Sequence, residues 1–362
     1  MRVREACFWG SVAGAGWVLV GYPLALLALP SRRWKQSEDG FPHVSILVPA
    51  YREREALREK LVALSGLDYP ADRLELIVTV DEDEELARIA REARPDATVL
   101  FSAERAGKAA ALSRGLAAAS GEIVLMTDAN NVLERDSVRA AVRHFADPEI
   151  AAVAGRRGER GSVYDRYEDV IRALESRSGS VAAMSGEFMA VRRELMPDFP
   201  HEVVNDDFWL LCHLVRAGGR VVYEPRASSR EEAVPVAGEV ARRTRMTAGR
   251  VMALSELESL PRGFAWRALS HKYGRLALPF LLLSVLASSL ALVRRRPYRL
   301  AAAAQGAAYL TGALATAGVV PPGRAGRLAR AAGQFTLGNV AVALGVIRGV
   351  RGRQGVTWDP VR

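Results

Sequence analysis

Two acidic positions follow directly after apolar runs that have the length of buried strands. Asp81 comes after LELIVTV (74–80), and Asp128 comes after EIVLMT (122–127), with Asn130 two residues further on. Open α/β sheets bind ligands at the carboxyl ends of their strands, so we expect these side chains to meet at one edge. Their oxygen atoms suit a divalent cation that carries a diphosphate. A simple turn, which Asp and Asn also favour, is the alternative interpretation of each segment taken alone.

Further charged residues stand where helices are predicted to begin. Gly107 and Lys108 open a helix of small residues, which places a cation and free backbone amides where a phosphate can bind. Asn205, Asp206 and Asp207 open the helical segment FWLLCHLVRAG, and three arginines follow at close spacing: Arg242, Arg243 and Arg245. Taken singly, the acids can be helix caps, Lys108 a solvated surface lysine, and the arginines a membrane-facing patch. Their joint occurrence in this order favours one shared site.

These side chains need a scaffold, and residues 40–262 predict one of alternating strands and helices. Short apolar runs rich in β-branched residues predict buried strands, and helical periodicity fills the gaps between them. This alternation predicts an α/β domain with a mostly parallel sheet and helices on both faces. The predicted strands are 43–50, 74–80, 98–101, 122–127, 150–155 and 220–225, and the predicted helices are 53–65, 82–93, 107–119, 135–145 and 164–176.

The N-terminal segment predicts a membrane helix. Residues 7–30 carry no charge, and about 20 apolar residues suffice to cross a bilayer. A signal peptide is the competing interpretation, but its apolar core is about 7 to 15 residues long and ends at a small-residue cleavage site, which is not evident here. We therefore predict that residues 1–35 form a retained transmembrane anchor.

The C-terminal third predicts two or three further transmembrane segments within residues 276–349. Residues 276–293 and 300–320 are uncharged stretches of spanning length, separated by a basic hairpin. Residues 331–347 are shorter and richer in glycine, so this stretch can span, enter and return, or rest on the surface. The predicted fold class therefore adds transmembrane helices at both ends of the α/β domain.

Two shorter segments border these predicted spans. Aromatic and basic residues alternate over 263–275, which predicts an interfacial helix along the lipid headgroups, or else the cytoplasmic end of the next span. Residues 350–362 form a basic tail.

The charge and cysteine content narrow the choice of partner and compartment. The formal charge of +9 suits nucleic acid or an anionic membrane, but much of the basic excess flanks the apolar segments, so we predict membrane lipids and no nucleic acid. The two cysteines, Cys7 and Cys212, indicate no disulfide framework. Arg32, Arg33 and Lys35 place the following domain in the cytoplasm by the positive-inside rule, whereas the three arginines 294–296 oppose that topology.

The segments 42–262 resemble, in order, the motifs of the family 2 glycosyltransferases, which include cellulose and hyaluronan synthases. VSILVPAYREREAL resembles the first strand and nucleotide-binding turn, VTVDEDEE the next acidic signature, and RAGKAAALSRGL the lysine-containing helix start. LMTDANN is similar to the metal-binding D-x-D segment, SGEFMAVRRELM to the acceptor-side segment, and VVNDDFWLLCHLVRAGGRVVYEP to the segment with the catalytic base.

The resemblance implies a GT-A fold and a role for each matching residue. Pro49, Tyr51, Glu53, Asp81, Lys108 and Asp128 would bind the donor, a nucleotide sugar and most simply a UDP-sugar. Asp128 and Asn130 would hold Mg²⁺ or Mn²⁺ on its diphosphate. Asp207 would be the general base beside Asp206, and Arg245 would meet the leaving diphosphate, because this chemistry needs charge stabilisation and a proton acceptor.

Departures from the family pattern qualify this expectation. Asn130 stands at the second acidic position of D-x-D, Asp206 stands where the family usually has Glu, and Arg242 and Met246 replace the Gln and Trp of Q-x-x-R-W. We therefore predict modest metal affinity and a non-processive, inverting glycosyltransferase of the inner membrane, with a cytoplasmic catalytic domain and a lipid-linked or polysaccharide acceptor. The alternatives are a catalytically impaired scaffold of a glycan-synthesis complex and a transporter; uncharged spans argue against transport.

Overall fold

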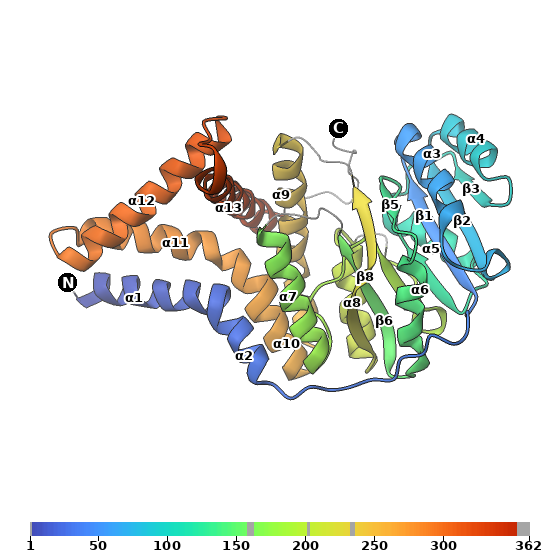
Figure 1. Cartoon of the computed structure of the whole chain (residues 1–362), viewed down its shortest axis with the longest axis horizontal. Coiled ribbons are helices and arrows are strands. Elements are labelled where there is room, and N and C mark those ends of the chain that lie inside the picture. The colour runs from blue at the N-terminus through green and yellow to red at the C-terminus, as the bar shows by residue number, and fades with distance from the viewer. Residues whose placement is uncertain (1, 158–162, 201–202, 232–235, 353–362) are drawn as a thin grey trace.

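The computed structural model describes residues 2–157, 163–200, 203–231 and 236–352. Figure 1 shows two parts, an α/β domain and a bundle of long helices that extends away from it. The N-terminal helix belongs to the bundle, an extended segment then leads to the α/β domain, and the chain returns to the bundle after α9 (Val236–Met252).

The α/β domain is built on one eight-stranded sheet with the order β3-β2-β1-β4-β7-β6-β8-β5. Strands β3, β2, β1 and β4 are parallel neighbours, whereas β7 is antiparallel to both β4 and β6. The parallel prediction therefore holds for this first half, and the sheet as a whole is mixed. The strands are β1 (Val44–Ala50), β2 (Leu74–Asp81), β3 (Thr98–Ser102), β4 (Ile123–Met126), β5 (Asn131–Leu133), β6 (Ile150–Arg157), β7 (Met189–Arg192) and β8 (Arg220–Glu231).

Helices cover both faces of the sheet, as the apolar strands require. Successive residues of β1 point to opposite faces, so that Ile46 and Val48 belong to one buried cluster and Leu47 to the other. The first cluster includes residues of α3 (Arg54–Ala63), α4 (Glu84–Ala93) and α6 (Ser137–Val142). The second includes residues of α5 (Lys108–Ala118), α8 (Asp206–Arg216) and α10 (Arg262–Ala268). All five predicted helices are present, including α7 (Val163–Ser178).

Within the part of the chain that the structure describes, two continuous helices are long and apolar enough to cross a membrane. The first spans Arg2–Ala28 and consists of α1 (Arg2–Gly16), a π-helical turn at Trp17–Gly21 and α2 (Tyr22–Ala28). The second spans Arg262–Ala291 and consists of α10, a π-helical turn at Leu269–Tyr273 and α11 (Gly274–Ala291). At 1.5 Å per residue each exceeds the hydrocarbon thickness of about 30 Å. These helices indicate that the chain associates with a membrane.

The predicted interfacial helix 263–275 is part of the second long helix rather than a separate element. Phe264 and Ala268 are buried in the cluster that contains α8, so these side chains pack against the α/β domain and not against lipid. Of the predicted basic tail 350–362, residues 353–362 lie outside the described residues.

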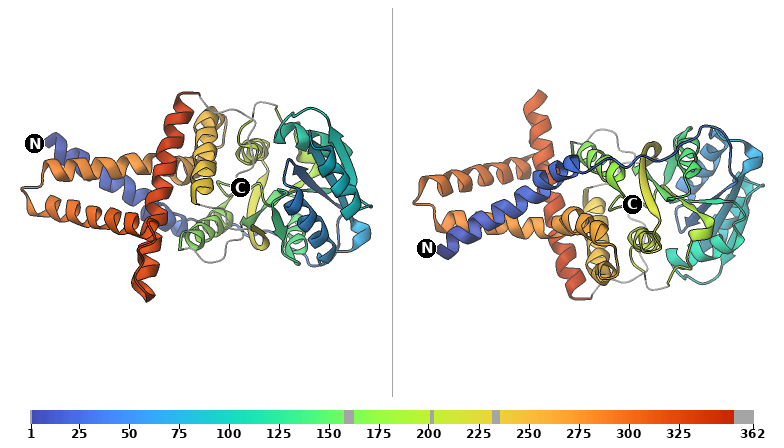
Figure 2. Two further views of the ribbon diagram at one scale, coloured as in Figure 1. Left: turned by 90° about the horizontal axis from the view of Figure 1, so that it is seen from above. Right: turned by 90° about the horizontal axis from the view of Figure 1, so that it is seen from below.

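The remaining predicted spans form helices with different orientations. Helix α12 (Arg296–Thr316) packs on α11, whereas α13 (Gly323–Val350) runs across the end of the bundle next to the α/β domain (Figure 2). Helix α13 contacts α9, α11 and α12. The N-terminus and the turn between α11 and α12 lie together at the far end of the bundle, where Glu5 and Arg295 form an ion pair.

Candidate active site

A cavity of about 350 Å³ opens at the carboxyl ends of β1, β2 and β4. All ten residues that the sequence predicted for the site line it: Pro49, Tyr51, Glu53, Asp81, Lys108, Asp128, Asn130, Asp206, Asp207 and Arg245. They come from segments that are up to about 200 residues apart in the chain, so only the fold brings them together. Their individual chemical roles remain predictions.

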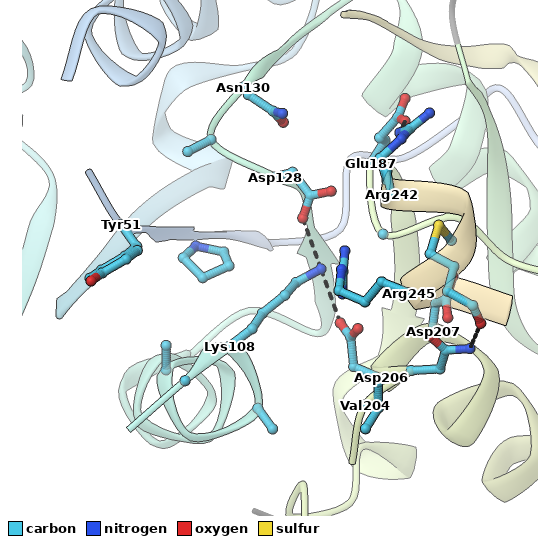
Figure 3. A pocket seen from close by; sticks show the side chains of 18 of the residues that line it. Tyr51, Lys108, Asp128, Asn130, Glu187, Val204, Asp206, Asp207, Arg242 and Arg245 are labelled. Atoms are coloured by element: carbon cyan, nitrogen blue, oxygen red, sulfur yellow. Dashed lines mark hydrogen bonds and ion pairs between the residues drawn. The ribbon is translucent and has the colours of Figure 1, made fainter. Parts of the chain in front are cut away.

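Lys108 lies between two of the predicted carboxylates (Figure 3). Its Nζ is 2.8 Å from Oδ1 of Asp128 and 3.1 Å from Oδ2 of Asp206. Burial works to lower the pKa of Lys108, but the two carboxylates outweigh this and hold it above its ordinary value. Burial likewise opposes ionisation of Asp128, and Lys108 keeps the pKa of that carboxyl below its usual range. The ammonium therefore ties the end of β4 to the start of α8 and keeps Asp128 charged.

Asp207 is buried in the first turn of α8 and has a different environment. Its Oδ1 accepts a hydrogen bond of 2.7 Å from the backbone N–H of Phe208. Burial raises the pKa of Asp207, and the neighbouring negative charge of Asp206 raises it further. The two adjacent acids therefore differ. Asp206 is paired with Lys108, whereas the pKa of Asp207 is shifted upward, in the direction that favours a general base.

Helix α9 closes the cavity beside α8. Asn205 Nδ2 donates a hydrogen bond of 3.0 Å to the carbonyl oxygen of Met246, which joins the start of α8 to α9. A Cβ atom at Gly249 would lie 2.7 Å from a methyl group of Val204, so glycine permits this close approach. Arg245, on the same helix, faces the cavity together with Arg242 (Figure 3).

Asp81 shapes the turn that presents Lys108. Its Oδ2 accepts hydrogen bonds of 3.1 Å from the backbone N–H groups of Ala106 and Gly107, and its Oδ1 pairs with Arg114. Gly107 has a φ of +87°, which favours glycine at this position. Both oxygens of the Asp81 carboxylate already have protein partners. A contact between Asp81 and a nucleoside would therefore use the lone pairs that these partners leave free.

The Tyr51 end of the cavity carries a flat aromatic and cationic surface. The Arg105 guanidinium carbon lies 4.2 Å from the ring centroid of Tyr51, and the hydroxyl of Tyr51 donates to Glu82 at 3.0 Å. Arg105 was not predicted as a site residue, although it stands two positions before Gly107 in the quoted lysine segment.

The sequence profile described as "Glycosyltransferase like family 2" matches residues 42–249, more than half of the chain. The chain belongs to this family. A mannosyltransferase from Pyrobaculum calidifontis, solved with GDP-Man and Mn²⁺, is 27% identical and covers 97% of this chain and 100% of its own, with a TM-score of 0.78. The architecture of the whole chain, bundle included, therefore has a counterpart among glycosyltransferases of the GT-A fold.

Two curated relatives match shorter portions. A probable glycosyltransferase, YdaM, from Bacillus subtilis is 33% identical over 34% of this chain and 31% of its own length. A poly-beta-1,6-N-acetyl-D-glucosamine synthase from Staphylococcus epidermidis is 24% identical over 51% of this chain and 48% of its own. The chain thus spans about half or less of the length of these curated relatives.

This glycosyltransferase also has a cluster of charges that the sequence did not predict. Glu187 and Glu231 bind Arg157 at 2.7 Å and 2.9 Å, and Glu231 accepts a hydrogen bond of 3.0 Å from Nδ2 of Asn130. Burial raises the pKa of Glu187 to about 8; Arg157 opposes this shift, and the carboxylates of Glu231 and Asp128 add to it. Arg348 of α13 also lines the cavity. These partners are distant in the chain, so no local spacing marked them.

The cavity offers a divalent cation two protein ligands, the side chains of Asp128 and Asn130. Because Nδ2 of Asn130 donates to Glu231, the oxygen of this amide is the atom left for a cation, beside the carboxylate of Asp128. Among the described residues no cluster of at least three His, Cys, Asp or Glu side chains has metal-binding geometry. Such a sparse set fits Mg²⁺ or Mn²⁺, which take further oxygen ligands from substrate phosphates and water.

Proposed function

We propose that this membrane-associated family 2 glycosyltransferase transfers one sugar, with inversion, from a nucleoside diphosphate sugar to a hydroxyl of a lipid-linked or glycan acceptor. The observation that carries the proposal is the convergence of Asp128, Lys108, Asp207 and Arg245 on one cavity. A divalent cation held by Asp128 and Asn130 would neutralise charge on the donor diphosphate. The structure of the Pyrobaculum mannosyltransferase in complex with GDP-Man and Mn²⁺ supports this donor class.

Each part of the reaction has a residue of this chain assigned to it. Asp207 takes the proton of the acceptor hydroxyl as its oxygen bonds to the anomeric carbon. The bond from that carbon to the donor phosphate breaks, and the nucleoside diphosphate leaves with the bonding electrons. Arg245 stabilises the developing negative charge. Lys108 holds Asp128 and Asp206 in register, and Tyr51 with Arg105 provides the surface for the nucleobase.

We further propose that the active site faces the cytoplasm beside the inner membrane and adds a single sugar or a few. The cavity wall formed by α9 adjoins α13, which lies across the end of the bundle, so an acceptor anchored in lipid can approach from that side. Met246 lines this wall at the position where processive relatives of the cellulose synthase type have tryptophan. This residue supports a non-processive reaction.

Nucleotide release by the purified protein tests the function. UDP- and GDP-sugars are supplied with Mn²⁺, with Mg²⁺ or with EDTA, together with membrane lipid extract as the source of acceptor. We expect Asp207→Asn to lower transfer at least about 100-fold while donor binding stays near wild type, since a general base contributes 10²–10⁴-fold. Asp128→Ala should weaken metal-dependent donor binding itself. Equal turnover by wild type and both variants would exclude the assignment.

A further inference from the structure

Helix α3 buries a lysine directly beneath the turn that carries Asp128 and Asn130. Lys60 is completely buried, and it shares the buried stripe of its helix with Leu57 and Leu61. An apolar side chain is the ordinary occupant of such a position, because burying an ammonium group is costly unless it is well bonded. Among the described residues no carboxylate lies within 4.0 Å of its Nζ, so an ion pair does not explain its presence.

The ammonium of Lys60 bonds to both ends of the turn. Nζ donates to Oγ1 of Thr127 at 2.8 Å, and to the carbonyl oxygen and Oδ1 of Asn131 at 2.9 Å and 2.7 Å. Thr127 directly follows β4, and Asn131 begins β5, so these residues bracket Asp128 and Asn130. All three N–H bonds of the ammonium are used, and the acceptors are themselves buried.

The same two residues continue the network to Glu187, which also lines the cavity. Oγ1 of Thr127 donates to the carbonyl oxygen of Glu187 at 2.7 Å, and Nδ2 of Asn131 donates to the same oxygen at 3.3 Å. The next residue toward the N-terminus, Gly186, lies against Lys108, because a Cβ there would be 2.8 Å from Nζ of Lys108. Displacement of the turn would therefore also move the segment that faces Lys108.

We infer that Lys60 is a positioning residue that fixes the turn 127–131 in the geometry that binds the cation and the donor diphosphate. This inference rests on the proposed function, which assigns Asp128 and Asn130 to the cation. A turn whose two ends are already held by hydrogen bonds does not have to become ordered when the ligand binds, so the entropy cost of ordering it falls on folding instead. Lys60 reaches the site through its hydrogen bonds to Thr127 and Asn131, and its charge also attracts Asp128, but Lys60 does not line the cavity.

Binding of Mn²⁺ with UDP, and in parallel with GDP, measured by calorimetry and by the Mn²⁺ electron paramagnetic resonance signal, tests this inference without turnover. We expect Lys60→Met to weaken Mn²⁺-dependent nucleotide binding at least 10-fold. Leu57→Ala is the matched control, because it also removes buried contacts from α3 but leaves the hydrogen bonds of Lys60 to the turn in place. It should lower thermal stability and change binding less than about twofold.

If Lys60→Met does not fold, Thr127→Val tests the same hydrogen-bond network by a second route. It removes one acceptor of Lys60 and one donor to Glu187, and should weaken binding 3- to 10-fold. The double variant should bind no more weakly than Lys60→Met, because both changes act through one network. Binding by Lys60→Met and Thr127→Val equal to wild type, while Asp128→Ala loses binding, would overturn the inference alone. Undiminished binding by Asp128→Ala would instead overturn the proposed metal site.

Discussion

The two adjacent aspartates at the start of α8, Asp206 and Asp207, lie in different electrostatic environments. Asp206 pairs with Lys108, whereas Asp207 is buried beside the charge of Asp206 without a cation in an ion pair among the described residues. A like charge nearby and burial both disfavour ionisation. The pair can thus keep one acid bound to Lys108 for positioning and the other available for proton transfer.

We expect the pH dependence of nucleotide release to report Asp207. Its raised pKa means that the base becomes ionised only above the ordinary aspartate value of 3.8, so turnover should fall as pH drops through a midpoint above that value. Asp206→Asn removes the neighbouring charge and should move this acidic limb to lower pH, as measured by kcat at saturating donor between pH 4 and 9.

Glu187→Gln is the control for this profile, since Glu187 also has a raised pKa and lines the same cavity. It should leave the acidic limb in place. An acidic limb that Asp206→Asn does not move would contradict the coupling between the two aspartates.

At the scale of elements, α7 joins the catalytic domain to the long apolar helices. Glu175 of α7 is fully buried, and its Oε1 accepts a hydrogen bond of 2.6 Å from the hydroxyl of Tyr22 and lies 2.8 Å from Nδ1 of His271. Tyr22 begins α2, and His271 lies in the π-helical turn before α11. One carboxylate thus connects three helices that are far apart in the chain.

Glu175→Ala should destabilise the protein by several kcal/mol, because each buried donor that loses its acceptor costs about 1–3 kcal/mol. Glu149→Ala is the control: its ion pair with Arg32 is more than half exposed, and such pairs contribute about 1 kcal/mol or less. Thermal unfolding in detergent, followed by near-ultraviolet circular dichroism, measures both. Equal shifts in Tm for the two variants would show that this junction is not a stabilising contact.

At the scale of the whole molecule, the cavity lies close to the bundle, and α13 of the bundle contributes Arg348 to the lining. The turn between α11 and α12 lies at the opposite end, near the N-terminus. Basic residues occur at both ends of the bundle, so the positive-inside rule does not decide the orientation by itself.

Cysteine accessibility in intact cells measures that orientation. With Cys7→Ser as background, we expect Arg294→Cys, in the turn between α11 and α12, to react with a membrane-impermeant maleimide from outside. Glu104→Cys, on the surface of the catalytic domain, should react only after permeabilisation. The reverse pattern would place the active site outside, and protection of both positions would show that the bundle does not cross.

The parallel half of the sheet could be predicted from the sequence because local pattern determines it. The apolar runs of β1, β2 and β4 are buried on both faces of the sheet. Asp81 and Asp128 lie at or just after the carboxyl ends of β2 and β4, where the apolar runs stop. The order of the family motifs predicted Asp207 and Arg245 as residues of the site, and both line the cavity. These features depend on residues that are neighbours in the chain.

The remaining features depend on partners that only tertiary structure supplies. Strands β5 and β7 have three and four residues, too few to show a period, and exist because β8, β4 and β6 offer them hydrogen-bonding edges. The sequence predicted Lys108 as a donor-binding residue, with a solvated surface lysine as the alternative, and predicted no role for Lys60. The fold alone places one between two carboxylates and the other beneath a turn, because burial and ion pairing arise from segments that meet only after the chain has folded.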